Sequence, residues 1–193
     1  MTAKIIRREI HNMSPRLSRR GLEVPLSAAS GSGVFIGYAS LFNQRDQSGD
    51  IVMPGAFYAS LLRRPAEDIR MLFQHDPAEP VGTWLDVRET DKGLFVRGRF
   101  DKNVQRGREL LSLLESGGID GLSIGFKTIN SRKDRATSAR LLTKIDLWEI
   151  SLVTFPMLEG ARVSAVKSSS RARADSLFQK QPPSLNNGER PNG

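Results

Sequence analysis

Short segments with the alternation of β-strands constrain the fold of this 193-residue chain most strongly. Apolar residues with a period of two bury one face of a sheet, and Gly, Pro, Asn and Asp separate the segments. Only 55–64 and 104–116 have helical character, and the strand–helix alternation of a parallel sheet does not occur. The pattern predicts a mainly β (α+β) fold, a closed or nearly closed β-barrel with flanking helices. The expected strands are 34–42, 51–53, 69–75, 81–87, 94–100, 120–126, 141–156 and 161–166.

The ends of the two expected helices follow from local sequence signals. Pro54 precedes the first helix, where its missing N–H costs nothing, and Pro65 follows it. Asn103 is the expected cap of the second helix, and Gly117-Gly118 is its expected end. Between the last two long strands, 131–140 is polar and basic, which predicts an exposed loop.

The net charge of +8 is concentrated at the two ends of the chain. Residues 1–30 contain six Lys/Arg and two Asp/Glu, and residues 167–193 contain five and two. The remaining part, with 18 positive and 17 negative residues, is close to neutral. We therefore expect a basic flexible N-terminal arm over 1–32, a folded domain over 33–166 and a disordered C-terminal tail over 167–193.

The absence of cysteine excludes disulfides, thiolate metal sites and cysteine nucleophiles. His11 and His75 are the only histidines, which argues against a zinc hydrolase site, so we expect no metal and no cofactor. No segment is long and apolar enough to predict a membrane span or a signal peptide.

A serine in the segment 120–126 is the candidate nucleophile. Leu122, Ile124 and Phe126 alternate with Gly121, Ser123 and Gly125, so the serine shares a strand face with two glycines. That face leaves room for another backbone to approach. A small residue packed inside a sheet is the structural alternative.

A serine nucleophile needs a base, and the base needs a group that orients it. His75 ends a predicted strand, whereas His11 lies in the predicted arm, so His75 is the candidate general base. Glu149 lies in a very apolar strand, where an unpaired carboxylate would be costly to bury. It is the candidate orienting acid; Asp146 is its rival, and weaker alternatives are Asp76 and Asp120.

Five segments resemble, in order and at similar spacing, the motifs of the tailed-bacteriophage prohead maturation protease family, and gene transfer agents contain similar proteases. The resemblance covers roughly residues 33–166. Two departures are Met157-Leu158 after Pro156, where the family usually has Ala-Asn, and Gln74 where Asn is common. The segments are 37–43, 50–57, 73–76 with 81–82, 121–126 (Gly-Leu-Ser-Ile-Gly-Phe) and 149–156 (Glu-Ile-Ser-Leu-Val-Thr-Phe-Pro).

The resemblance implies a serine endopeptidase with a fold like that of the herpesvirus assemblins. It carries the catalytic pair to His75 and Ser123, and the third member to Glu149. It also implies that the protein works inside the immature capsid, in the cytoplasm of the bacterial host. There it would cleave the major capsid protein or scaffold, and itself. By analogy alone, the loop with Arg132 and Arg140 is a candidate for the oxyanion donors.

Three other functions are alternatives. One is a non-catalytic β-barrel that acts as a scaffold or as a nucleic-acid-binding capsid component, and the positive net charge favours it. Against it, no strand interleaves aromatic and basic residues as base-stacking surfaces do. An inactive homologue would keep the fold alone. An esterase would have the strand-to-helix elbow Gly-x-Ser-x-Gly, which does not occur at Ser123. We expect protein substrates, no membrane and no specific nucleic acid, and the sequence allows an oligomer.

Overall fold

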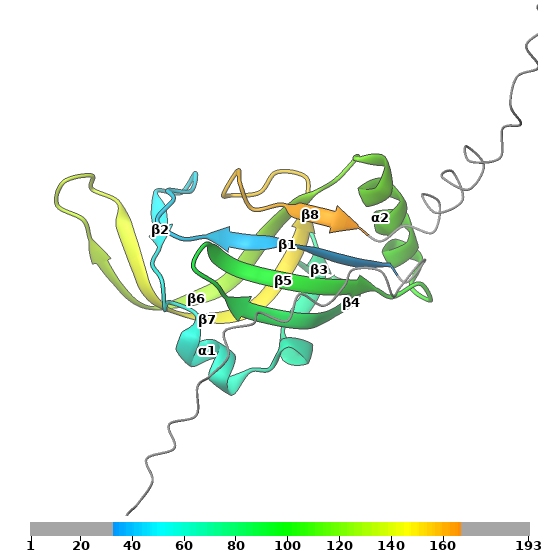
Figure 1. The fold of residues 1–193 in the computed structure, drawn as a ribbon, viewed down its shortest axis with the longest axis horizontal. Coiled ribbons are helices and arrows are strands. Elements are labelled where there is room, and N and C mark those ends of the chain that lie inside the picture. Colours follow the sequence, from blue (N-terminus) through cyan, green and yellow to red (C-terminus); the bar gives the residue numbers. More distant parts are fainter. Residues whose placement is uncertain (1–32, 167–193) are drawn as a thin grey trace, which may run out of the picture.

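The computed structural model describes residues 33–166; the predicted arm 1–32, with His11, and the predicted tail 167–193 lie outside the described residues. The described chain is mainly β, as predicted (Figure 1). The strands are β1 (Val34–Leu41), β2 (Asp50–Val52), β3 (Arg70–Phe73), β4 (Asp76–Glu89), β5 (Gly93–Phe100), β6 (Gly121–Lys133), β7 (Arg140–Val153) and β8 (Val163–Val166), and the helices are α1 (Tyr58–Arg63), the 3₁₀ turn η2 (Ala66–Asp68) and α2 (Gln105–Ser116).

Strand β7 pairs with three other strands of the described sheet. It pairs in parallel with β2 and β3 and antiparallel with β6. From β3 the sheet continues through β4, β5 and β1 to β8. An isolated bridge between Gly121 and Arg162 brings β6 near β8, but within 33–166 no ladder joins these two strands. The sheet is therefore not closed by strand pairing, and the predicted closed barrel is not confirmed.

Buried apolar side chains from the sheet and the helical segments form one core cluster. Trp84 contacts the ring of Phe35 edge-on at a centroid distance of 5.6 Å, an arrangement that aromatic pairs favour. Helix α2 packs on β4 and β5, whereas α1 packs mainly on β7 (Figure 1). The cluster includes Phe57 next to α1, Leu110 and Leu114 of α2, Val96 of β5 and Leu147, Ile150 and Leu152 of β7.

A β-bulge at Trp148 changes which residues of β7 face the core. Phe126 of β6 pairs with Leu147, whereas its neighbour Gly125 pairs with Glu149, so Trp148 is the extra residue. Without the bulge, Leu147 and Ile150 would lie on opposite faces of the strand. Both are 0% exposed here. The bulge thus keeps both Leu147 and Ile150 in the core and turns Glu149 to the other face.

The helix limits differ from those predicted. Helix α1 begins at Tyr58 because the chain from Met53 to Phe57 forms turns instead. Asn103 does not cap α2: the N-cap is Val104 without a side-chain bond, and the Asn103 N–H donates to Asp101. The predicted end of α2 is confirmed, since Gly117 follows it with a φ of 77°, a conformation that favours glycine.

Much of the predicted loop 131–140 is strand. Strands β6 and β7 pair as far as Lys133 and Arg140, which leaves a short turn over 134–139. The hairpin extends away from the rest of the sheet (left in Figure 1). Arg140 anchors its base through a two-point ion pair with the buried carboxylate of Asp50.

Candidate active site

A tight turn between β3 and β4 presents His75. Phe73 pairs with Asp76, so Gln74 and His75 are the two residues of the hairpin turn. Their φ angles are 54° and 62°, the left-handed region that type I′ turns require. The Gln74 N–H donates to the Leu152 carbonyl, 2.9 Å away, which holds the turn against β7.

The imidazole of His75 contacts the carboxylate of Glu149. The distance between His75 Nδ1 and Glu149 Oε1 is 2.5 Å. The His75 side chain is 41% exposed and the Glu149 side chain 13%, so the base meets solvent while the acid is largely covered. The hydrogen bond to Glu149 raises the pKa of His75 above its ordinary 6.5; partial burial opposes this increase, and attraction by the carboxylate charge adds to it.

Gly125 makes room for the Glu149 side chain. The two residues are opposite each other on β6 and β7, and the carboxylate lies across the glycine. A Cβ atom at position 125 would lie 1.9 Å from Glu149 Oε1, which no packing permits. The glycine of the Ser-Ile-Gly-Phe segment is therefore a spatial requirement of the His75–Glu149 pair.

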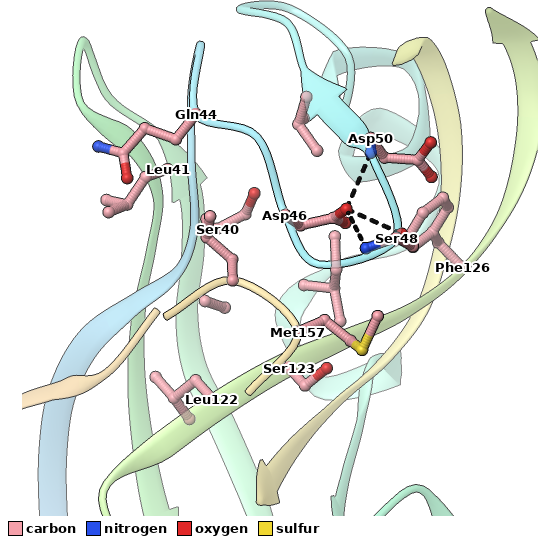
Figure 2. Close-up of a pocket in the computed structure, with 14 residues that line it drawn as sticks. Ser40, Leu41, Gln44, Asp46, Ser48, Asp50, Leu122, Ser123, Phe126 and Met157 are labelled. Atoms are coloured by element: carbon pink, nitrogen blue, oxygen red, sulfur yellow. Dashed lines mark hydrogen bonds between the residues drawn. The ribbon is translucent and has the colours of Figure 1, made fainter. Parts of the chain in front are cut away.

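Ser123 lies on β6 opposite Ser151 of β7 and shares a face with Gly125. It is 5% exposed and lines a pocket of about 110 Å³. Figure 2 shows Ser123 beside Met157 of the loop after β7, with Asp46 on the loop that faces it. Among residues 33–166, no hydrogen bond joins Ser123 to His75. Strand β7 lies between β6, which carries Ser123, and β3, which leads into the turn with His75.

The other carboxylates considered from the sequence have different partners. Asp146 bonds Arg64, Ser60 and Trp148, and the hydrogen bond from Trp148 is the main cause of its lowered pKa. Asp76 accepts from the backbone N–H of Ala78, and Asp120 pairs with Arg162. Of the four candidates, Glu149 is the one that contacts His75. The catalytic roles of Ser123, His75 and Glu149 stay predictions.

The basic segment considered for the oxyanion donors lies at the other end of the β6–β7 pairing from Ser123. Ser123 pairs with Ser151 near the start of β6, whereas Lys133 pairs with Arg140 at the other end of the hairpin. At about 3.3 Å per residue, this places Lys133 about 30 Å along the strand from Ser123. Arg140 itself pairs with Asp50, which lines the same pocket as Ser123. The assignment of this segment as the source of the oxyanion donors stays a prediction by analogy.

Ser151 belongs to the site but is not among the residues predicted from the sequence. Its hydroxyl accepts from the His75 backbone N–H and donates to Glu149. The available signal is the spacing Glu149-x-Ser151, which puts two polar side chains on one face of an apolar strand. In the described range, no cluster of three or more potential ligands suits a metal ion. No helix described there is long and apolar enough to cross a bilayer.

The described domain is mainly β and holds a carboxylate-bound imidazole and, on β6, a serine, which are the residue types that serine hydrolases use. The sequence comparison makes the class specific. The chain belongs to the caudovirus prohead serine protease family, whose model matches residues 20–175. The predicted family resemblance is thereby confirmed.

One relative in sequence agrees with this assignment, and the two solved structures are compared in fold alone. The chain is 36% identical over 148 residues to the prohead protease of Enterobacteria phage HK97; the match covers 76% of this chain and 65% of that protein. The capsid assembly protease of bacteriophage T4 matches in fold, with a TM-score of 0.51, 12% identity, and coverage of 62% of this chain and 80% of that one. KSHV protease gives a TM-score of 0.46 at 13% identity, over 68% of this chain and 64% of that one.

Proposed function

We propose that this protein is a serine endopeptidase that cleaves capsid or scaffold protein during maturation of a phage or phage-like particle. Membership of the prohead serine protease family supports the reaction class and the setting. The observation that carries the mechanism is the 2.5 Å contact between His75 Nδ1 and Glu149 Oε1. A partly exposed imidazole held by a largely buried carboxylate suits the role of a general base.

The contact defines the role of each imidazole nitrogen. Nδ1–H donates to Glu149, so Nε2 carries the lone pair and is the basic atom. His75 Nε2 takes the Ser123 hydroxyl proton while Ser123 Oγ bonds to the scissile carbonyl carbon. The proton then passes to the leaving amine as the C–N bond breaks. Water, deprotonated by His75, hydrolyses the acyl-enzyme and restores Ser123.

The substrates follow from the family setting. The major capsid protein or a scaffold protein of the same particle is the protein substrate, and the chain also cleaves itself. Cleavage takes place inside the procapsid, in the cytoplasm of the bacterial host. The pocket beside Ser123 gives a substrate side chain a place next to the scissile bond.

Co-expression with the major capsid protein of the same genome tests this function. Wild type, Ser123→Ala and Ser60→Ala are compared by intact mass. Ser60 is the control because it is a serine that is 1% exposed and lies outside this pocket. We expect wild type and Ser60→Ala to shorten the capsid protein or themselves, and Ser123→Ala to leave both at full length. If wild type leaves both intact while particles assemble, the protease assignment fails and the non-catalytic scaffold is favoured.

A further inference from the structure

Ser151 is a buried hydroxyl in the most apolar part of β7. It is 0% exposed, and its neighbours Ile150, Leu152 and Val153 are buried as well. A buried hydroxyl needs hydrogen-bond partners to offset the loss of water. The partners of Ser151 are the candidate base and the candidate acid.

The direction of both hydrogen bonds is fixed by chemistry. The ionised Glu149 carboxylate only accepts, so the Ser151 proton points to Glu149 Oε2, 2.8 Å away. The Ser151 oxygen then accepts from the His75 backbone N–H at 3.1 Å. Together with the Nδ1–Oε1 contact of 2.5 Å, these bonds form a closed ring of three residues.

The two hydrogen bonds of the Ser151 hydroxyl restrain the His75 turn and the Glu149 carboxylate. His75 lies in a turn whose two residues both have positive φ, a strained conformation for residues other than glycine. The Ser151 hydroxyl satisfies the N–H of that turn and ties it to β7. It also binds the Glu149 oxygen that does not face the imidazole, so both carboxylate oxygens are held.

We propose that Ser151 is a positioning residue of the active site. It holds the His75 turn and the Glu149 carboxylate in register, so that Nδ1 stays bonded and Nε2 remains available to Ser123. The effect on catalysis rests on the function proposed above, whereas the effect on the protonation of His75 does not. The two parts are therefore tested separately.

Ser60 offers a closely matched control. It is 1% exposed, and its hydroxyl also accepts a backbone N–H, from Leu147, and donates to a carboxylate, that of Asp146. Ser60→Ala and Ser151→Ala thus remove the same kind of hydroxyl with the same pair of bonds. Only Ser151 touches His75 and Glu149.

The first measurement is the His75 pKa, by NMR, in a full-length Ser123→Ala chain that cannot cleave itself. His11→Gln leaves one imidazole to observe. With Ser151→Ala we expect the pKa of His75 to fall toward 6.5, as with Glu149→Gln, and with Ser60→Ala to stay at the parent value. Loss of the donated hydrogen bond alone would leave more negative charge on the Glu149 oxygens for the imidazolium, and would raise the His75 pKa. A fall therefore reports lost positioning, and an unchanged or higher pKa overturns the proposal.

The second measurement is the cleavage rate of purified capsid protein by the chain with Ser123 intact. We expect Ser151→Ala to lower kcat by about 10- to 100-fold with KM changed less than about threefold, because substrate binding is untouched. Ser60→Ala, assayed well below its melting temperature, keeps the parent kcat. If wild type is inactive, the proposed function fails while the NMR result still stands. If wild type and Ser151→Ala cleave equally fast, the positioning role fails.

Discussion

Gly125 lets Glu149 reach His75, so the smallest side chain added there should break the pair. In Gly125→Ala the new Cβ would lie 1.9 Å from Glu149 Oε1, and the carboxylate must move. We expect the cleavage rate to fall about 100-fold, the loss typical of a disturbed general base. Thermal unfolding should show a chain that is still folded. Gly118→Ala is the control, since its Cβ meets nothing closer than Cδ2 of the exposed Leu113 side chain, at 3.2 Å. Equal rates in the two variants would contradict the spatial role of Gly125.

The raised pKa of His75 predicts the pH dependence of cleavage. A general base works only when neutral, so the rate should rise with pH through a midpoint above 6.5. Glu149→Gln removes the carboxylate charge, so we expect the midpoint to move down toward 6.5 and the plateau to fall by about 100-fold or more. A pH–rate profile of kcat/KM measures both. An unchanged midpoint in Glu149→Gln would show that Glu149 does not control this imidazole.

The same shift has a consequence for stability. Because folding raises the pKa of His75, the pair with Glu149 stabilises the protein fully below pH 6.5. This contribution is lost as the pH rises through the raised pKa. Urea unfolding of wild type and Glu149→Gln should therefore give free energies of unfolding that converge with increasing pH. A difference that grows with pH would contradict the assignment.

At the level of the element, the turn that carries His75 contains a residue poorly suited to its conformation. Gln74 has a φ of 54°, where asparagine is favoured over glutamine. We expect Gln74→Asn to raise the free energy of unfolding by about 0.5 kcal/mol, because left-handed backbone costs longer side chains about 1 kcal/mol or more. The reverse exchange at Asn43, with a φ of 59°, should lower it by a similar amount. Urea unfolding measures both, and changes of the same sign in the two variants would show that φ is not the cause.

Strand β7 shows where prediction of the site from the sequence ends. Its apolar composition indicates a buried strand and makes any carboxylate within it notable. Strict alternation would place Glu149 on the same face as Leu147, away from Ile150. The bulge at Trp148 puts Leu147 on the face of Ile150, and Glu149 on the opposite face, the same side as Asp146. The two acids differ in their neighbours: Asp146 bonds Arg64, and Glu149 contacts His75. A bulge depends on the pairing with β6, so the sequence alone left both acids as candidates.

For the whole molecule, the alternation of apolar residues was sufficient to predict the mainly β class and most strands. It did not predict how far β4 and the hairpin of β6 and β7 extend. The extension of β6 is mostly polar and exposed, as at Asn130 and Arg132, so it has no apolar period to detect. The extension of β4 is also largely exposed and contains Pro77 and Pro80, which argue against a strand. The order of the strands also depends on contacts distant in sequence, such as the parallel pairing of β3 with β7.

The uneven distribution of charge predicts how removal of both ends changes the protein. Residues 33–166 contain the core cluster and every residue of the proposed site, and this part of the chain is nearly neutral. We expect the fragment 33–166 to cleave capsid protein at the rate of the full chain. Its affinity for duplex DNA at low salt should fall at least about 10-fold, because fewer cations displace the counterions of the phosphates. Fluorescence anisotropy across a salt series measures this affinity. DNA binding that survives the truncation, together with absent cleavage, would favour a nucleic-acid-binding capsid component, since the basic ends would then not explain the charge-dependent binding.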